Sequence, residues 1–391
     1  MIPLVKDTID KEDIDSLIKW LETYPRLTKG NLTLEYEKKW SAFINRKYSA
    51  FVNSGSSANL LMIYALIEAG KLEIGDKVII PAVSWATDLT PVVQLGLTPI
   101  LCDCNLEDLS IDINHFKELI ITEKPKALIC VSVLGLVPKM EDIVNICNEN
   151  NIILLEDACE SLGSEFKNKK LGTFGLISTF STFFGHHMST IEGGMICTDD
   201  QEISNIIRGV RSHGWDRDMD EDYRNKLRKQ YDVKDFQSLY TFYYCGFNLR
   251  STDLQAFIGL NQLKKLNFII KKRNQNYDLY HRLLSNNIWK PPKNTKDLYI
   301  SNFSYPIIYK DREKIISALN DNDISVRPLI CGSLALQPFW KKKYPEVYLK
   351  NATIVNNNGF YVPNNHQISE QDIQKICNVI NEVLSTNHFK E

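Results

Sequence analysis

This sequence of 391 residues lacks long hydrophobic runs and an excess of charge of either sign. No apolar stretch approaches the roughly 18 residues that a membrane-spanning helix needs. The net charge is −2, which gives no electrostatic attraction to nucleic acid or to an anionic membrane. The first residues also lack the charged region and apolar core of a secretion signal. We therefore expect a cytoplasmic protein with neither a nucleic-acid nor a membrane partner.

Cysteine is present but lacks the spacing of a metal site. The number of cysteines is odd and no C-x-x-C pair occurs. Cys102 and Cys104 form the one close pair, which we interpret as small side chains at the end of a strand. Reduced thiols agree with a cytosolic setting, and we expect no metal. The nine cysteines stand at positions 102, 104, 130, 147, 159, 197, 245, 331 and 377.

Short apolar runs alternate with segments of helical periodicity between about residues 50 and 200. This alternation predicts βαβ units and a mostly parallel sheet that is covered by helices. Ligands bind in such folds beyond the carboxyl ends of the strands. The expected strands lie at 50–53, 77–80, 98–102, 127–133, 152–155 and 195–198.

Helical patterns come before and after this alternating region. Helices are expected at 10–20 and 34–43, near 263–285, and from Ser369 onward, with further strands near 304–309 and 324–328. We predict an α/β protein with a large domain over 1–262, N-terminal helices included, and a smaller α+β domain over 263–391. The first helix has one apolar face, which comprises Ile14, Leu17, Ile18 and Leu21.

A run of small residues, Gly55, Ser56 and Ser57, follows the first expected strand and opens an apolar helix. Backbone N–H groups at a helix start, together with hydroxyl side chains, form an anion site suited to a phosphate. Capping of the helix by Ser56 explains the same residues equally well. From these residues alone, both interpretations stay open.

Two further strand ends carry residues that suit a flat cofactor. Asp157 ends a buried strand, where its carboxylate can pair with a protonated pyridine nitrogen, although an acid that caps the next turn has the same pattern. Trp85 follows the strand at 77–80 and can stack on a ring, although a single tryptophan is more often part of the core.

In this order, the motifs resemble the DegT/DnrJ/EryC1/StrS aminotransferase family, the sugar-nucleotide branch of the type I pyridoxal-phosphate enzymes. The resemblance extends over nearly the whole chain. It implies the type I fold, pyridoxal or pyridoxamine phosphate as cofactor, and a homodimer with active sites at the subunit interface. The motifs that carry it are Leu27-Thr28-Lys29-Gly30, Gly55-Ser56-Ser57, Glu156-Asp157-Ala158, Ser181…His186…Glu192-Gly193-Gly194 and Gly246-Phe247-Asn248-Leu249-Arg250…Leu254-Gln255-Ala256.

The resemblance also implies a role for individual positions. Trp85 would stack on the cofactor ring, Asp157 would pair with its nitrogen, and Glu160 would face the cofactor. Asn248 would reach the phosphate in the neighbouring subunit. The phosphate in its own subunit would be held by Gly55, Ser56, Ser57 and Ser181.

The sequence departs from the family where the family has its cofactor-binding lysine. Six residues before Glu192 stands His186, and no lysine occurs between Lys170 and Lys226. An imidazole cannot hold the cofactor covalently, but it can move a proton near neutral pH. This exchange resembles the 3-dehydratases of dideoxysugar synthesis, with His186 as the catalytic base and acid.

One type of these dehydratases carries an iron–sulfur cluster on four cysteines. The corresponding region here offers only Cys197 and Cys245, so we expect no cluster. The resemblance therefore implies a nucleotide-linked 4-keto-6-deoxy sugar as substrate, such as GDP-4-keto-6-deoxymannose or a close relative, and L-glutamate as amino donor. Candidate substrate contacts are His213, Arg250 and Arg327.

Two other functions stay open at this point. One is a nucleotide-sugar 4-aminotransferase that works without a lysine, and the other is a cofactor-binding protein without catalysis. The product formed with glutamate distinguishes the first alternative, because an amino sugar would keep the nitrogen that a dehydratase releases as ammonia.

Overall fold

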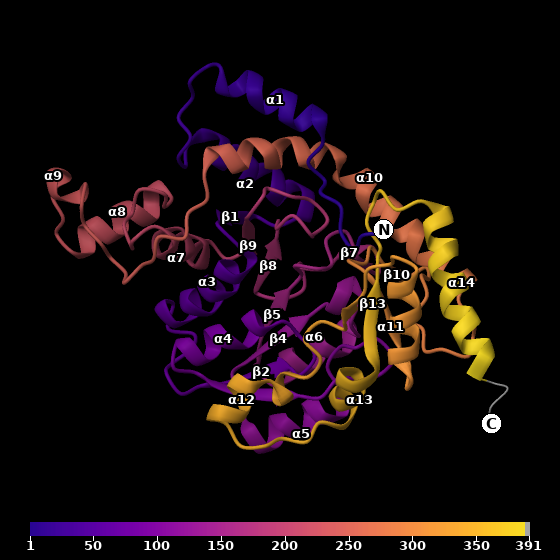
Figure 1. Cartoon of the computed structure of the whole chain (residues 1–391). Coiled ribbons are helices and arrows are strands. Elements are labelled where there is room, and N and C mark those ends of the chain that lie inside the picture. The colour runs from indigo at the N-terminus through magenta and orange to yellow at the C-terminus, as the bar shows by residue number, and fades with distance from the viewer. Residues whose placement is uncertain (388–391) are drawn as a thin grey trace.

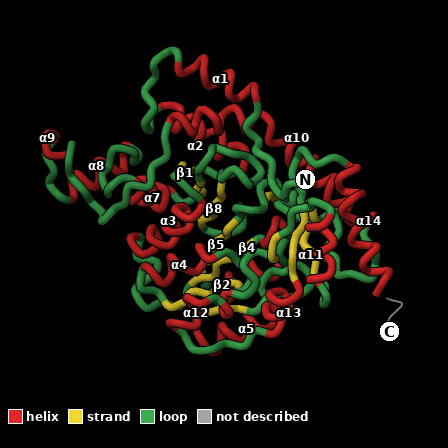
Figure 2. Tube along the Cα trace, viewed as in Figure 1, coloured by secondary structure: helices red, strands yellow, loops and turns green. Residues whose placement is uncertain are grey.

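A computed structural model describes residues 1–387 of the chain. At its centre lies a seven-stranded sheet, with the strands gathered in the middle of the molecule and helices around them (Figure 2). Six of these strands run parallel, and β9 runs antiparallel to both of its neighbours. In spatial order the strands are β1 (Tyr48–Val52), β9 (Gly194–Thr198), β8 (Ile177–Ser181), β5 (Ile153–Asp157), β4 (Ala127–Val131), β2 (Lys77–Pro81) and β3 (Thr98–Cys102).

Every residue of β4, β8 and β9 is buried, which requires cover on both faces of the sheet. Helix α3 packs on β8 and β9, α7 on β1 and β9, and α2 on β1, while α10 packs on α2. The helices up to this point are α1 (Lys11–Leu21), α2 (Asn31–Ile44), α3 (Gly55–Glu68), α4 (Ala86–Gln94), α5 (Ile113–Glu123), α6 (Met140–Glu149), α7 (Gln201–Arg211), α8 (Glu221–Gln230), α9 (Asp235–Ser238) and α10 (Asp253–Leu283).

The C-terminal part adds a second sheet of three antiparallel strands, in the order β11, β13, β12. A third small sheet joins β10 to the hairpin of β6 and β7. These elements are β6 (Glu165–Phe166), β7 (Lys169–Lys170), β10 (Leu298–Tyr299), β11 (Tyr305–Ile308), α11 (Arg312–Asp321), β12 (Arg327–Pro328), α12 (Pro338–Lys343), α13 (Lys350–Asn358), β13 (Gly359–Val362) and α14 (Glu370–Asn387).

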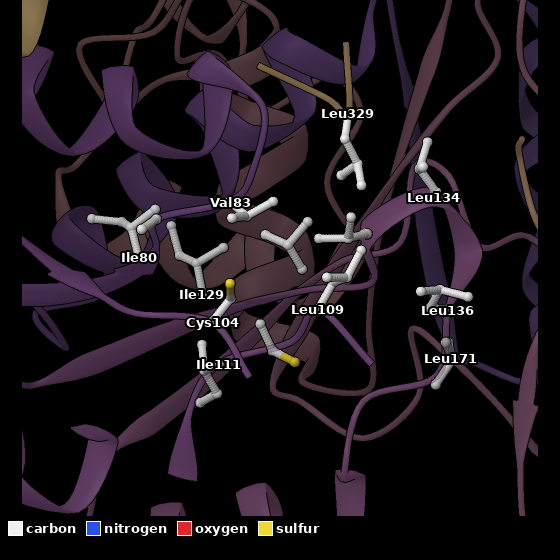
Figure 3. Close-up of a cluster of buried hydrophobic side chains, with 14 of the residues drawn as sticks. Ile80, Val83, Cys104, Leu109, Ile111, Ile129, Leu134, Leu136, Leu171 and Leu329 are labelled. Carbon is white, nitrogen blue, oxygen red and sulfur yellow. The ribbon is translucent and has the colours of Figure 1, made fainter. Parts of the chain in front are cut away.

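One hydrophobic core extends from the central sheet into the C-terminal part. It includes Ile80 of β2, Ile129 of β4, Leu109 and Leu329, all of which are drawn in Figure 3. It also includes Phe360 of β13. Burial of each such side chain contributes roughly 1.5–3 kcal/mol to folding. The predicted division at 262/263 falls inside the continuous helix α10 and remains a prediction.

The structure confirms the predicted α/β architecture and its mostly parallel sheet, but β8 was not predicted. Its sequence, Ile-Ser-Thr-Phe-Ser, has hydroxyl side chains where a buried strand usually has aliphatic ones. One of them, Thr179, donates a hydrogen bond of 2.6 Å to the side chain of Asn59, which meets the cost of its burial.

Two helices also differ from their predictions. Helix α10 begins at Asp253 rather than near 263, with Thr252 as its cap. The apolar face predicted for α1 is exposed at Ile14 and Ile18 in the single chain. Asp13 is the buried residue of α1, because it bonds with Lys265 of α10. Within residues 1–387, no helix combines the length and apolar character that crossing a bilayer requires.

Candidate active site

A cavity of about 690 Å³ lies beyond the carboxyl ends of the parallel strands. Asp157 is the last residue of β5 and Ser181 is the last residue of β8, so the sheet itself brings both to this edge. Segments from the N-terminus and from the C-terminal part complete the wall. The volume is in the range of small-molecule sites. Of the predicted site residues, those that line it are Gly55, Ser56, Trp85, Asp157, Glu160, Ser181, His186 and Arg327.

One end of the cavity is formed by the start of α3. The first N–H groups of a helix have no partner in the helix itself, so those of Gly55 and Ser56 are available to an anion. A Cβ atom on Gly55 would lie 2.9 Å from Cβ of Ser181 and 3.2 Å from Sγ of Cys159. A glycine at position 55 therefore allows the start of α3 to approach the end of β8 closely.

The cap of α3 is Ser54, and not Ser56 as one of the sequence interpretations had it. Oγ of Ser54 accepts a hydrogen bond of 3.0 Å from the backbone N–H of Ser57. The hydroxyl of Ser57 bonds with Ser54 as well, and Ser57 is not among the described residues that line the cavity. This leaves the Ser56 side chain exposed toward the cavity and makes an anion site and a cap compatible.

Asp157 is held in one orientation at the floor of the cavity. Its Oδ2 accepts a hydrogen bond of 2.7 Å from Nδ2 of Asn59, and its Oδ1 accepts one of 2.8 Å from the backbone N–H of Cys159. Asn59 lies on α3, and its Nδ2 also contacts Oδ1 of Asp88 at 3.2 Å. A carboxylate fixed in this way can receive a proton-bearing ring nitrogen without reorganising.

Two further acids of the cavity favour their protonated form. Burial, and then the negative charge of Asp157, raise the pKa of Asp88 well above its usual value. Burial raises the pKa of Glu160 to about 8. A hydrogen bond of 2.7 Å from the backbone N–H of Leu134 to Oε2 of Glu160 acts in the opposite direction. Burial thus raises the pKa of both of these acids near Asp157.

His186 lies in the loop that joins β8 to β9. The ends of this loop are tied by a hydrogen bond of 2.9 Å from the N–H of Thr182 to the carbonyl of Gly193. The imidazole lines the cavity, with its ring 5.3 Å from the ring of Phe303. Its Nδ1 is buried and has no hydrogen-bond partner among residues 1–387, so Nε2 is the nitrogen available to the cavity.

The surroundings of His186 favour a neutral ring. Burial lowers its pKa to about 4, Asp157 opposes this shift, and Arg273 adds to it. A neutral imidazole at physiological pH is ready to accept a proton. The neighbouring His187 is buried, and its Nε2 bonds with the carbonyl of Ser301 at 2.9 Å, which indicates a structural role.

None of the described residues that line this cavity is a lysine, and His186 is among them. No group of three or more His, Cys, Asp or Glu side chains that could hold a metal ion occurs within residues 1–387.

The profile of the DegT/DnrJ/EryC1/StrS aminotransferase family matches residues 7–381. The chain belongs to this family. It is 36% identical over 376 residues to the GDP-4-keto-6-deoxy-D-mannose 3-dehydratase of Escherichia coli O55:H7, covering 94% of this chain and 95% of the relative. The enzyme of the same name from Yersinia pseudotuberculosis is 33% identical over 389 residues, covering 97% of this chain and 98% of the relative.

A solved structure extends this similarity to three dimensions. It is the crystal structure of a GDP-4-keto-6-deoxymannose-3-dehydratase with a trapped PLP-glutamate geminal diamine. It superposes with a TM-score of 0.88 at 33% identity, and the alignment covers 97% of this chain and 100% of that one. The predicted family and its fold are therefore confirmed.

Besides Ser57, three of the predicted residues are not among the described residues that line the cavity. These three residues form a cluster of their own. Nε of Arg250 donates a hydrogen bond of 3.0 Å to Oδ1 of Asn248, and Nη2 of Arg250 lies 3.5 Å from Nε2 of His213. The guanidinium of Arg250 also lies 5.4 Å from the ring centre of Trp215. We call Asn248, Arg250 and His213 the outer cluster.

The sequence prediction missed several residues that line the cavity, and also Asn59, which orients Asp157 from behind it. Asn59 lies one turn beyond Gly55 on α3, a spacing that could have placed it on the same side of the helix. Asp88 follows Trp85 in the first turn of α4. Phe303 and Tyr361 come from the C-terminal part, and the sequence carries no local signal that brings them to the ends of the strands.

Proposed function

We propose that this chain is a pyridoxamine-phosphate-dependent 3-dehydratase that acts on a nucleotide-linked 4-keto-6-deoxy sugar, GDP-4-keto-6-deoxymannose or a close relative. One observation carries the proposal: His186 lines the cavity that contains Asp157, Ser181 and Trp85, and no lysine is among the described residues that line it. By its spacing before Glu192, His186 stands where the family resemblance places a lysine. The two dehydratases that share 33% and 36% of its sequence support the same reaction.

The residues of the cavity suit the cofactor at both of its ends. The phosphate would bind at the start of α3, to the N–H groups of Gly55 and Ser56 and the hydroxyl of Ser181, where a Cβ on residue 55 would obstruct it. Asp157, oriented by Asn59, would pair with the ring nitrogen. Ser57 would contribute through the helix start rather than through its hydroxyl, which bonds with Ser54.

The aromatic side chains of the cavity suit the flat part of the cofactor. Trp85 is 59% exposed in the chain alone and lines the cavity, so its ring is available to stack on the pyridine ring. Glu160, with a raised pKa, would present a neutral carboxyl beside it.

Pyridoxamine phosphate supplies an amine for the C4 ketone of the sugar and a ring that takes up electrons. His186 would remove the proton from the carbon that bears this amine, and would then protonate the C3 hydroxyl as it departs. Asp157 would keep the ring nitrogen protonated while charge moves onto it. Water would then hydrolyse the bond between nitrogen and C4, which releases ammonia and a 4-keto-3,6-dideoxy sugar and leaves the cofactor as pyridoxal phosphate. Restoring its amine form would require an amino donor, and glutamate is the one that the trapped complex of the similar dehydratase contains.

A homodimer with shared active sites is part of this proposal. Asn248, Arg250 and His213 lie outside the cavity of their own chain. Next to them, the segment with α8 and α9 extends from the body of the molecule (Figure 1). An outer cluster that reaches the phosphate and the substrate of a second chain would account for this position.

The test is product analysis with the full-length chain and pyridoxamine phosphate. Incubation with GDP-4-keto-6-deoxymannose and glutamate should release ammonia and yield a nucleotide sugar that lacks the C3 oxygen, as read by mass spectrometry. The corresponding CDP and dTDP sugars serve as controls for the nucleotide. A product that retains nitrogen at C4 would instead make the chain a 4-aminotransferase, and bound cofactor without turnover of any sugar would contradict catalysis altogether.

A further inference from the structure

A buried arginine, Arg273 of α10, lies directly behind the loop that carries His186. Its Nη1 donates to the carbonyl oxygens of Asn364 at 2.6 Å, Phe303 at 2.7 Å and Asn302 at 3.4 Å. Its Nη2 donates to the carbonyl of His186 at 3.3 Å. No salt bridge to Arg273 occurs in the part of the chain that the structure describes.

A guanidinium in this situation is costly for the fold. A buried charge without a counter-ion loses its hydration and gains only the dipoles of its acceptors. Burial lowers the pKa of Arg273 to about 9, which still leaves the group charged at neutral pH. Four carbonyl dipoles therefore surround a permanent cation at this point.

The acceptors belong to three segments that are distant in sequence, and two of the acceptor residues, His186 and Phe303, line the cavity. His186 belongs to the loop after β8, Asn302 and Phe303 precede β11, and Asn364 follows β13. Asn364 returns a hydrogen bond of 3.1 Å to the carbonyl of Arg273 itself. Through these contacts Arg273 fixes both the backbone of His186 and the aromatic ring against which its imidazole packs.

The charges that face His186 come from several elements. Asp157 on β5 favours the protonated ring, while Arg273 on α10 and burial oppose it. The neighbouring His187 is itself kept neutral by burial, with Arg273 adding to the effect. The remaining titratable groups that line the cavity are Asp88 on α4, Glu160 after β5, Cys159 beside it, Glu192 before β9, Arg327 on β12 and Tyr361 on β13.

We propose that Arg273 is a positioning residue of the site. It ties the loop of His186 to two C-terminal segments, one of which lines the cavity through Phe303. Its positive charge behind the imidazole adds to the effect of burial in keeping the ring neutral. A residue with a purely architectural role would need only the carbonyl contacts, whereas this role also needs the charge. The role of Arg273 in catalysis rests on the proposed function. Its effect on the pKa of His186 can be measured in the protein without cofactor.

The test separates charge from contacts with Arg273→Gln, which is neutral, and Arg273→Lys, which keeps the charge. Titration of the histidine ring signals by NMR in the cofactor-free full-length chain, assigned with His186→Gln, gives the pKa of His186. We expect Arg273→Gln to raise this pKa by about one unit and Arg273→Lys to leave it within a few tenths. Lys265→Gln removes a charge from the same helix and should leave the pKa of His186 unchanged.

The same variants have a kinetic signature. In Arg273→Gln the acidic limb of kcat/KM against pH should move upward with the pKa of His186, while in Arg273→Lys kcat falls several-fold with the limb in place. A folded Arg273→Gln in which His186 titrates as in the wild type would overturn the proposal. Circular dichroism checks the fold. Should Arg273→Gln not fold, Arg273→Met, which is also neutral, takes its place in the same titration. A wild-type His186 that titrates at its ordinary pKa near 6.5 would overturn the proposal by itself.

The two proposals can fail separately. If the pKa of His186 moves but no sugar is dehydrated, the proposed function fails and the role of the charge stands. If dehydration proceeds but the pKa does not respond to the charge at residue 273, only the role of Arg273 fails.

Discussion

The cavity residues and the outer cluster were predicted from the same family resemblance, yet they lie in different surroundings. Asp157, Ser181 and His186 converge in one cavity because they stand at or just after the carboxyl ends of adjacent strands. Asn248 and Arg250 bond to each other and are not among the described residues that line that cavity. One chain therefore brings Asp157, Ser181 and His186 together by itself, and its outer cluster lies apart from them.

The comparison separates the residues that one chain brings together by itself from those that it does not. A parallel sheet delivers side chains to one edge without help from a partner. The outer cluster does not line the cavity of its own chain, so its proposed role at a cofactor phosphate would require a second chain.

The largest effect should come from His186→Asn. Loss of the ring that transfers protons should lower kcat for ammonia release by about 10²–10⁴-fold, the usual contribution of a general base, with cofactor affinity retained. The matched control is His213→Asn in the outer cluster, for which we expect a change of at most about tenfold in KM. Equal losses in both variants would erase the functional distinction between the two regions.

The outer cluster can be tested by mixing two inactive variants. Asn248→Ala should reduce activity by about 10–100-fold, the loss of one or two good hydrogen bonds to an anion. When it is refolded together with His186→Asn, mixed dimers contain one site with both native residues. We expect recovery of about a quarter of the wild-type activity, since half of randomly formed dimers are mixed. Absence of any recovery would mean that the outer cluster serves its own chain or no site at all.

A smaller effect is expected from Gly55→Ala at the phosphate end of the cavity. The added Cβ would lie 2.9 Å from Cβ of Ser181, so the strand end must shift and cofactor affinity should fall about tenfold. Ser57→Ala, whose hydroxyl bonds with Ser54, should change the affinity by less than about threefold. The affinity of both variants is measured by titration with pyridoxal phosphate. A larger loss in Ser57→Ala than in Gly55→Ala would contradict the placement of the phosphate beside Gly55.

The smallest effect concerns pH. Because burial lowers the pKa of His186 to about 4, the base is neutral at all higher pH values. The activity should therefore stay nearly constant as pH falls from 7.5 to about 5.5, and its acidic limb should lie closer to 4 than to the ordinary histidine value of about 6.5. An acidic limb near pH 6.5 that persists when each of the other histidines is replaced would belong to His186. It would show that burial does not lower the pKa of this residue.

The sequence was sufficient for the features that local patterns determine. Asp157 follows an apolar run that predicts a buried strand, and His186 was found by counting back from Glu192 in a motif of fixed spacing. Six of the seven strands of the central sheet have the apolar pattern that predicts them. The seventh, β8, depends on hydroxyl groups whose partner Asn59 lies far away in sequence, so its burial has no local signature.

The parts that were not predicted share this dependence on distant contacts. Arg273 lies in a helix with an ordinary polar pattern, and only the approach of Asn302, Asn364 and the His186 loop gives it a role. The partnership of Asp88 with Asn59 likewise arises from the packing of α4 beside α3. Neither spacing nor periodicity along the chain encodes such meetings.

The most direct test of the central claim, that His186 occupies the place of the cofactor-holding lysine, is His186→Lys. The variant should bind pyridoxal phosphate covalently, and reduction with borohydride followed by peptide mass spectrometry should find the cofactor on residue 186. Its dehydration of the keto sugar should be abolished. A variant that cannot be labelled at residue 186, or that dehydrates the sugar as fast as the wild type, would contradict the account.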